Sequence, residues 1–205
     1  MKAVLIAGVA GLVSAVCAGA DITWKGEGET TAWSDGSNWE GGVAPALGDT
    51  AVIPTGKTAG MASADISYVS ATETKLAGIS LPAADGGLYI KNTTSVTLSV
   101  PLSGIGPVEI DNGGSVSLTL GADNGNYSGP MTIRKSEVRT DYTHLNAFGK
   151  NNVVTNIVEA GTASQHVYFF KGGDYYNTWQ IVGLPAWSTT QSFYTYYAVV
   201  FNKPV

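Results

Sequence analysis

The chain has 205 residues, a formal net charge of −5 at pH 7, and 13% charged against 44% hydrophobic residues. The acidity argues against nucleic acid as a partner, because binding phosphate needs clustered positive charge. The hydrophobic content is too high for a disordered chain, and 26 glycines among many Ser and Thr residues disfavour long helices. The composition therefore favours a β-rich, secreted protein, for which we expect no cofactor.

Residues 1–20 have the pattern of a signal peptide. Lys2 precedes an apolar run, and Ala18-Gly19-Ala20 forms a small-residue cleavage site before Asp21. A membrane anchor is the alternative, but a spanning helix needs about 20 apolar residues, more than this run offers. Cys17 also raises the alternative of a lipoprotein, which the valine before it disfavours.

Cleavage there leaves residues 21–205 as the mature chain. The sole cysteine is removed with the signal peptide, so the mature chain has no disulfide, no thiol nucleophile and no cysteine-ligated metal site. We expect this form to be exported to the cell surface or the extracellular space and not to span a membrane.

Residues 21–56 form a segment rich in tryptophan and glycine, which holds Trp24, Trp33 and Trp39. We interpret it as a capping region, because the open apolar end of a repetitive β-fold needs covering. Thr50–Ile53 is the first clear strand, and Pro54 ends it because proline cannot donate to a ladder.

Residues 57–205 read as a series of short strands separated by turns such as Asn112-Gly113-Gly114. The sequence offers no convincing helix beyond one turn within Tyr142–Gly149. The expected strands are Ile66–Ser70, Leu76–Leu81, Leu88–Lys91, Ser95–Val100, Pro107–Ile110, Ser115–Leu120, Met131–Lys135, Asn152–Glu159, Gln165–Lys171, Trp179–Val182 and Phe193–Phe201.

Regularly spaced short strands predict a solenoid, a sandwich or a barrel. The outward positions of these strands are mostly Ser and Thr rather than Lys or Glu. Small hydroxyl residues suit strands that are stacked on neighbours from both sides. The pattern favours an all-β solenoid, with an antiparallel β-sandwich or a barrel as the alternative.

Two segments carry a resemblance to a known family. The first, Thr23–Pro54, contains Thr23-Trp24, Ser37-Asn38-Trp39 and Gly48–Ile53; the second, Leu118–Ile133, contains Leu118–Gly121 and Asn126–Ile133, with Leu145–Gly149 after it. Both resemble bacterial autotransporter-type passenger proteins with the autotransporter-associated β-strand repeat. The resemblance implies a right-handed parallel β-helix on a bacterial surface.

The chain departs from that family in two ways. Arg134–Glu137 stand where the repeat usually has a glycine-rich turn, and the sequence ends at Val205 without a translocator barrel. A barrel of eight or more strands of about ten residues each, together with its turns and loops, needs well over a hundred further residues, as a rough estimate. We expect the chain to be a truncated piece of a longer protein, with further repeats as its neighbours; export by another route is the alternative.

Residues that could carry catalysis are few. Glu109 and Asp111 share one face of a predicted strand and could form a carboxylate pair for glycoside cleavage, but we interpret them instead as part of a solvated strand edge. A polysaccharide lyase would also need a basic proton acceptor, which Arg134, Lys135 or Arg139 could provide. His166, in a strand-like run, and His144 are the only histidines. We therefore expect no catalytic site and no enzyme activity.

Asp123–Asn126 offers oxygen ligands around a glycine, as a calcium loop does. An EF-hand needs a glutamate at the twelfth position, where this chain has Arg134. We interpret the segment as a plain turn and expect no metal site.

Aromatic side chains are the remaining candidates, because they stack on sugar rings. The glycan-binding candidates are Trp24, Trp33, Trp39, Tyr194, Tyr196 and Tyr197. The sequence thus predicts an exported, non-enzymatic β-solenoid segment with a structural or adhesive role and an extracellular glycan or surface partner. A secreted glycan-binding module and a β-helix polysaccharide lyase or hydrolase are the alternatives.

Overall fold

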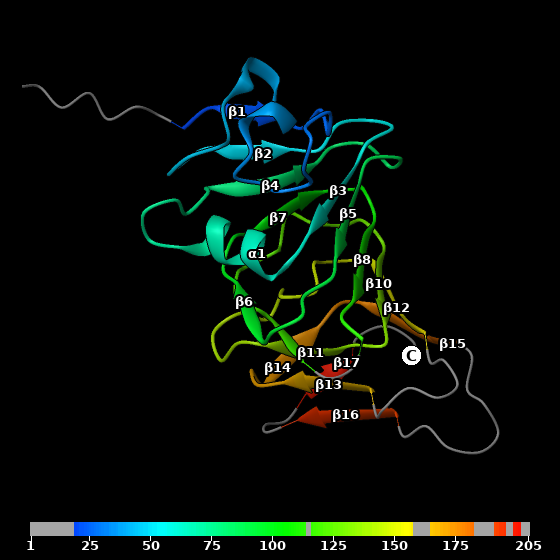
Figure 1. The fold of residues 1–205 in the computed structure, drawn as a ribbon. Helices are drawn as coiled ribbons and strands as arrows, with labels where there is room; N and C mark the ends of the chain where they lie inside the picture. Colours follow the sequence, from blue (N-terminus) through cyan, green and yellow to red (C-terminus); the bar gives the residue numbers. More distant parts are fainter. Residues whose placement is uncertain (1–18, 114–115, 158–164, 183–190, 196–198, 202–205) are drawn as a thin grey trace, which may run out of the picture.

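The computed structural model describes residues 19–113, 116–157, 165–182, 191–195 and 199–201, so that most of the predicted signal peptide lies outside it. All strand pairs in this part of the chain are parallel, and they build three stacked sheets and a two-stranded one (Figure 1). The predicted parallel β-helix with a tryptophan-rich N-terminal cap is confirmed. The antiparallel sandwich is excluded by the direction of the strands.

Each sheet takes strands from successive coils of the chain. The first sheet contains β1 (Asp21–Thr23), β2 (Thr50–Val52), β4 (Gly78–Leu81) and β7 (Leu102–Gly104). The second contains β3 (Thr58–Met61), β5 (Gly87–Ile90), β8 (Val108–Asp111), β10 (Met131–Arg134), β12 (Val153–Ile157) and β15 (Thr178–Val182). The third contains β6 (Val96–Leu98), β9 (Ser117–Leu120), β11 (Glu137–Thr140), β13 (Gln165–Phe169) and β16 (Gln191–Thr195), and the two-stranded sheet pairs β14 (Gly173–Tyr175) with β17 (Val199–Phe201).

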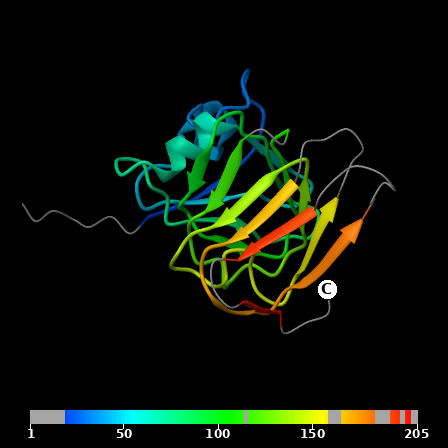
Figure 2. The ribbon, with the colours of Figure 1, turned by 90° about the horizontal axis from the view of Figure 1, so that it is seen from below.

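The chain visits the first, second and third sheets in turn, as in β4, β5 and β6 and then β7, β8 and β9. Paired residues are therefore 20 to 29 positions apart, as between Leu88 and Val108 and between Ala59 and Leu88. The strands of the third sheet lie side by side and point the same way in Figure 2. The segment 21–56 contributes β1 and β2 to the first sheet, so it forms part of the ladder that it covers.

Apolar side chains form columns inside the coils. In the second sheet, Leu88, Val108, Met131 and Val154 are in register on neighbouring strands, and each is at most 1% exposed. A parallel strand buries one such face only against the coils next to it. The inward columns are thus the hydrophobic core of the molecule.

One corner of the coils allows no side chain. A Cβ on Gly106 would lie 2.0 Å from the Gly86 carbonyl oxygen, and a Cβ on Gly129 would lie 2.2 Å from that of Gly106. In the next coils this corner is held by asparagines: Asn152 Nδ2 donates to the Gly129 oxygen at 2.9 Å, and Asn177 Nδ2 donates to Asn152 Oδ1. Close backbone contact thus holds this corner in the earlier coils, and a ladder of buried asparagine amides holds it in the later ones.

A helix occurs where the sequence pattern predicted a strand. Ile66–Ser70 lies in α1 (Ser63–Ser70), so that prediction was wrong. Ile66 and Val69 are both 0% exposed, which fits the three-residue spacing of a helix face. The helix start is fixed by Asp65, whose Oδ2 accepts from the Ala62 N–H at 2.9 Å.

The helix takes the place of a third-sheet strand in its coil, between β3 and β4, and it contacts the edge strand β6. Ser70 Oγ accepts from the Ser99 N–H at 3.2 Å, and Ser63 Oγ accepts from the Thr93 N–H at 2.9 Å. An exposed strand edge invites association with other chains. The helix covers the edge of the third sheet.

The other differences from prediction are short strands. Within the last predicted strand, Phe193–Phe201, the structure has the end of β16 and all of β17, which pair with different sheets. The strands β1, β3, β7, β11 and β14 were not predicted, because they are three or four residues long and contain glycine or charged side chains. The helical turn expected within Tyr142–Gly149 is a hydrogen-bonded turn closed by the Gly149 N–H and the Asn146 oxygen at 2.9 Å.

Replacing Ile133 by alanine should destabilise the protein by about 2–5 kcal/mol, because the side chain is fully buried in the central strand β10 and leaves a cavity. The matched control is Thr132→Ala on the outward side of the same strand, with an expected change within about 0.5 kcal/mol. Urea unfolding of both variants measures the difference. Equal losses would contradict the assignment of the inward column.

Candidate functional site

The three N-terminal tryptophans form one buried cluster. Trp24, Trp33 and Trp39 are 3%, 0% and 0% exposed, and their ring centroids are 4.9 to 5.9 Å apart. Two of the three ring contacts are edge-to-face, the geometry that aromatic quadrupoles favour. The indole faces are covered, so none is available to a sugar ring in this arrangement.

Hydrogen bonds fix this cluster to the first coil. Trp33 Nε1 donates to the Gly60 oxygen of β3 at 2.7 Å, and its backbone N–H donates to Asp65 Oδ1 of α1 at 2.8 Å. Trp39 Nε1 donates to the Trp33 oxygen at 2.9 Å. The cluster therefore closes the N-terminal end of the stack. Its three indoles offer no exposed ring face to a glycan.

The predicted C-terminal tyrosines are only partly described. The backbone of Tyr194 lies in β16 and pairs with Tyr168 of β13. Tyr196 and Tyr197 lie outside the described residues. The backbone register therefore places Tyr194 beside Tyr168, and its role as a glycan-binding residue stays a prediction.

A row of aromatic rings runs along the outer side of β13 and was not predicted. His166, Tyr168 and Phe170 alternate with the buried Val167 and Phe169, and successive ring centroids in the outer set are 5.8 and 5.9 Å apart. The period-2 alternation of this segment was the signal in the sequence that could have revealed the row.

Residues of β11 and of the loop after it contact this row. Tyr142 stacks on Phe170 with ring centroids 4.9 Å apart and planes 8° apart. Arg139 of β11 places its guanidinium carbon 5.2 Å from the Tyr168 ring centroid and forms an ion pair with Glu137. A cation over an aromatic face strengthens the contact between adjacent strands.

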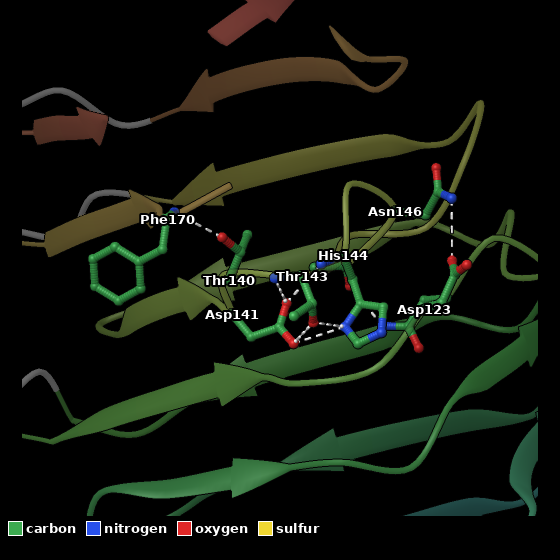
Figure 3. Close-up of polar contacts among 9 residues, drawn as sticks. Asp123, Thr140, Asp141, Thr143, His144, Asn146 and Phe170 are labelled. Atoms are coloured by element: carbon green, nitrogen blue, oxygen red, sulfur yellow. Dashed lines mark hydrogen bonds and ion pairs between the residues drawn. The ribbon is translucent and has the colours of Figure 1, made fainter. Parts of the chain in front are cut away.

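Asp141, Thr143 and His144 bring a carboxylate, a hydroxyl and an imidazole together beside this row (Figure 3). His144 Nδ1 lies 2.7 Å from Asp141 Oδ2 and 2.8 Å from Thr143 Oγ1. A catalytic relay needs the hydroxyl and the carboxylate on different nitrogens of the imidazole. Here both contacts meet at Nδ1, so the cluster is a local turn that organises the loop after β11.

Burial disfavours the charged form of Asp141, but hydrogen bonds from the Thr143 side chain and from the His144 and Thr143 N–H groups outweigh it. The net effect lowers the pKa of the Asp141 carboxyl below its ordinary value. The carboxylate is thus ionised and fully engaged at neutral pH.

Glu109 and Asp111 lie on the outer face of β8, a central strand and not the sheet edge that the sequence suggested. Arg134 Nε lies 3.2 Å from Glu109 Oε1, and Arg134 is in register with Asp111. Burial, and then the charges of Asp111 and Glu109, raises the pKa of the nearby Tyr89 hydroxyl. The structure thus brings a predicted base beside the two acids, in an arrangement that fits an ion pair between coils.

The other two candidate bases, Lys135 and Arg139, lie in the turn before β11 and in β11 itself. Lys135 lies between β10 and β11 with a positive φ of 46°. Arg139 Nε donates to Glu137 Oε1 at 2.7 Å. Arg139 thus pairs with an acid of its own strand, β11.

The Asp123–Asn126 segment is a turn, as interpreted from the sequence. Asn124 is 2% exposed; its Oδ1 accepts from the Leu102 N–H at 2.7 Å, and its Nδ2 donates to the Ala147 oxygen at 2.6 Å. Asp123 Oδ1 accepts from Asn146 Nδ2 at 3.1 Å (Figure 3). The Asn124 bonds join three successive coils. Within the described residues, no group of three or more His, Cys, Asp or Glu side chains could hold a metal ion.

No protein-family model, curated protein or solved structure matches the chain. Among the residues that the structure describes, no helix combines the length and the apolar character needed to cross a bilayer. The fold is thus the firm basis for a functional proposal.

Replacing Trp33 by alanine should lower the free energy of unfolding by about 3–5 kcal/mol, because the change removes a buried indole and its hydrogen bond to the Gly60 oxygen. The same holds for Trp39→Ala. Thermal and urea unfolding measure the loss, and retention on immobilised polysaccharide is measured in parallel. Lost retention with an unchanged melting temperature would instead assign these tryptophans to a glycan site.

Asp141 should contribute to stability in a pH-dependent way. Its pKa is lowered in the folded state, so its contribution is present above the unfolded value of about 3.9 and is lost as the pH falls through the folded pKa. The stability difference between the parent chain and Asp141→Asn should therefore shrink as the pH falls from about 5 to about 2, the window in which the carboxylate becomes protonated. Urea unfolding across the series measures it; a constant difference would contradict the assignment.

Proposed function

We propose that this chain is an exported, non-enzymatic β-solenoid segment of a bacterial cell-surface or extracellular protein, with a structural or adhesive role. The observation that carries the proposal is the stack of parallel coils (Figure 1). Its N-terminal end is closed by the buried tryptophan cluster. Each added coil lengthens the stack by about 4.8 Å, and its inward apolar side chains continue the existing core. A rod of this kind suits a protein that must extend from a surface.

The outer faces support an adhesive role. Along the strands the inward positions are mostly apolar, whereas the outward positions carry hydroxyl, charged and aromatic side chains. In the third sheet, Thr119, Arg139 and Tyr168 are in register on successive strands. A rigid rod holds such groups in a fixed line, so that several can contact a partner at once, and multivalent contact raises avidity.

The residues that resemble the autotransporter-associated repeat have structural roles that such a repeat needs. Tyr127 is fully buried and donates its hydroxyl to the Pro130 oxygen at 2.7 Å. Gly129 lies in the close-packed corner, and Ile133 lies in an inward column. We propose membership of a surface-exposed passenger class of this type on these residues.

The departure from the repeat also has a physical account. In the turn at Arg134–Glu137, Lys135 takes the left-handed conformation that glycine favours. Ser136 is fully buried, and its Oγ donates to the Arg134 oxygen and accepts from the Asn112 N–H at 2.9 Å. A serine between coils thus replaces the usual glycine-rich turn.

Expression of residues 1–205 in a Gram-negative host should yield a product that begins at Asp21 outside the cytoplasm, because the small side chains of Ala18 and Ala20 suit cleavage of a signal peptide. Intact-mass measurement on cell fractions gives the cleavage position. The control, Ala20→Lys, should accumulate as uncleaved precursor. Recovery of the uncleaved parent chain from the cytoplasm would reject export.

A further inference from the structure

A cavity of about 280 Å³ lies at the end of the aromatic row, lined by Tyr142, Phe170, Lys171 and Gly172. Tyr142 is 62% exposed, and Phe170 supports it from behind in the stacked pair. Large exposed aromatic side chains at a concave site are typical of binding surfaces rather than of scaffolding. The cavity therefore differs in character from the polar coil surfaces around it.

The surroundings hold this cavity in shape. The Phe170 N–H donates to Thr140 Oγ1 at 2.9 Å (Figure 3), and the Tyr175 hydroxyl donates to the Lys171 oxygen at 2.9 Å. The Asp141 turn fixes the backbone beside Tyr142. A preorganised site loses less entropy when it binds a ligand.

The size and polarity of the cavity select a class of ligand. Sites for drug-sized molecules begin at roughly 300 Å³, so this volume suits one small ring. The exposed Tyr142 ring offers an apolar face, and Lys171 offers a cation at the cavity wall. Asp141 is already engaged by Thr143 and His144. Among the described residues of the lining, the Lys171 ammonium is therefore the ionic group that a ligand would meet.

We propose that this cavity binds a hexuronic acid residue of an acidic polysaccharide. The apolar face of the sugar stacks on Tyr142, and its carboxylate accepts a charge-assisted hydrogen bond from Lys171. The polymer continues along the row formed by Phe170, Tyr168 and His166, whose centroids are 5.8 and 5.9 Å apart, comparable with the length of a sugar ring. This inference rests on the proposed adhesive role and names its ligand class.

The test uses the purified mature chain with two matched probes, a tetrasaccharide of mannuronic acid and the neutral tetrasaccharide of mannose, which differ at C6. Isothermal titration should show tighter binding of the acidic probe. Tyr142→Ala should weaken both probes by about tenfold. Lys171→Gln should weaken only the acidic probe, again by about tenfold, the size of one hydrogen bond to a charged group.

Two controls separate the site from general surface effects. Tyr176→Ala removes another exposed ring, and Lys150→Gln removes an exposed cation from a different turn; both should bind as the parent chain does. Tyr142→Phe keeps the stacking ring and should retain affinity. Circular dichroism of every variant confirms the β-solenoid independently of binding.

Equal affinity for the acidic and neutral probes would overturn the assignment of the carboxylate to Lys171. Parent-like binding by Tyr142→Ala, or no binding by a folded parent chain at millimolar probe, would overturn the site itself. Either result would leave the exported rod intact. A parent chain without a β-rich spectrum would instead reject the solenoid and, with it, the proposed function.

Discussion

Each coil of this protein can bury its apolar side only against the coils next to it, so the register between coils governs everything else. Leu88, Val108, Met131 and Val154 occupy the same position on successive strands because their partners are held in parallel register. A slip of one residue would turn these side chains to solvent. Two corner devices oppose such a slip: backbone contact at Gly106 and Gly129, and the asparagine amides that continue the same corner.

The ends of such a ladder are its weak points, and the N-terminal end shows how one is closed. Asp65 Oδ1 accepts from the Trp33 N–H, while Oδ2 accepts from the Ala62 N–H at the start of α1. One carboxylate thus joins the tryptophan cluster to the helix that covers β6. The same side chains that could have stacked on sugars are used for closure, which leaves the outer face of the third sheet as the binding surface we propose.

The two faces of one strand support the proposed structural role and the proposed binding site separately. Val167 and Phe169 of β13 point into the core, whereas His166, Tyr168 and Phe170 form the outer row. Period-2 alternation therefore lets one strand maintain the rod and carry recognition groups. Since the inward residues are fixed by packing, the outward ones are free to differ between coils, as Thr119, Arg139 and Tyr168 do.

The sequence by itself determined the strand-rich character and most of the strand positions, because alternation and turn residues are local signals. It favoured a solenoid over a sandwich, and the parallel direction of the strands in the tertiary structure decided between them. It did not determine α1, since Ile66–Ser70 has the β-branched and aromatic residues of a strand and only tertiary packing selects the helix. Only the tertiary structure decided which aromatics are buried and which line a cavity. Tyr142 and Lys171 are 29 positions apart in the sequence and meet because one coil returns the chain beside the previous one. The register between coils sets that return, and no local pattern encodes it.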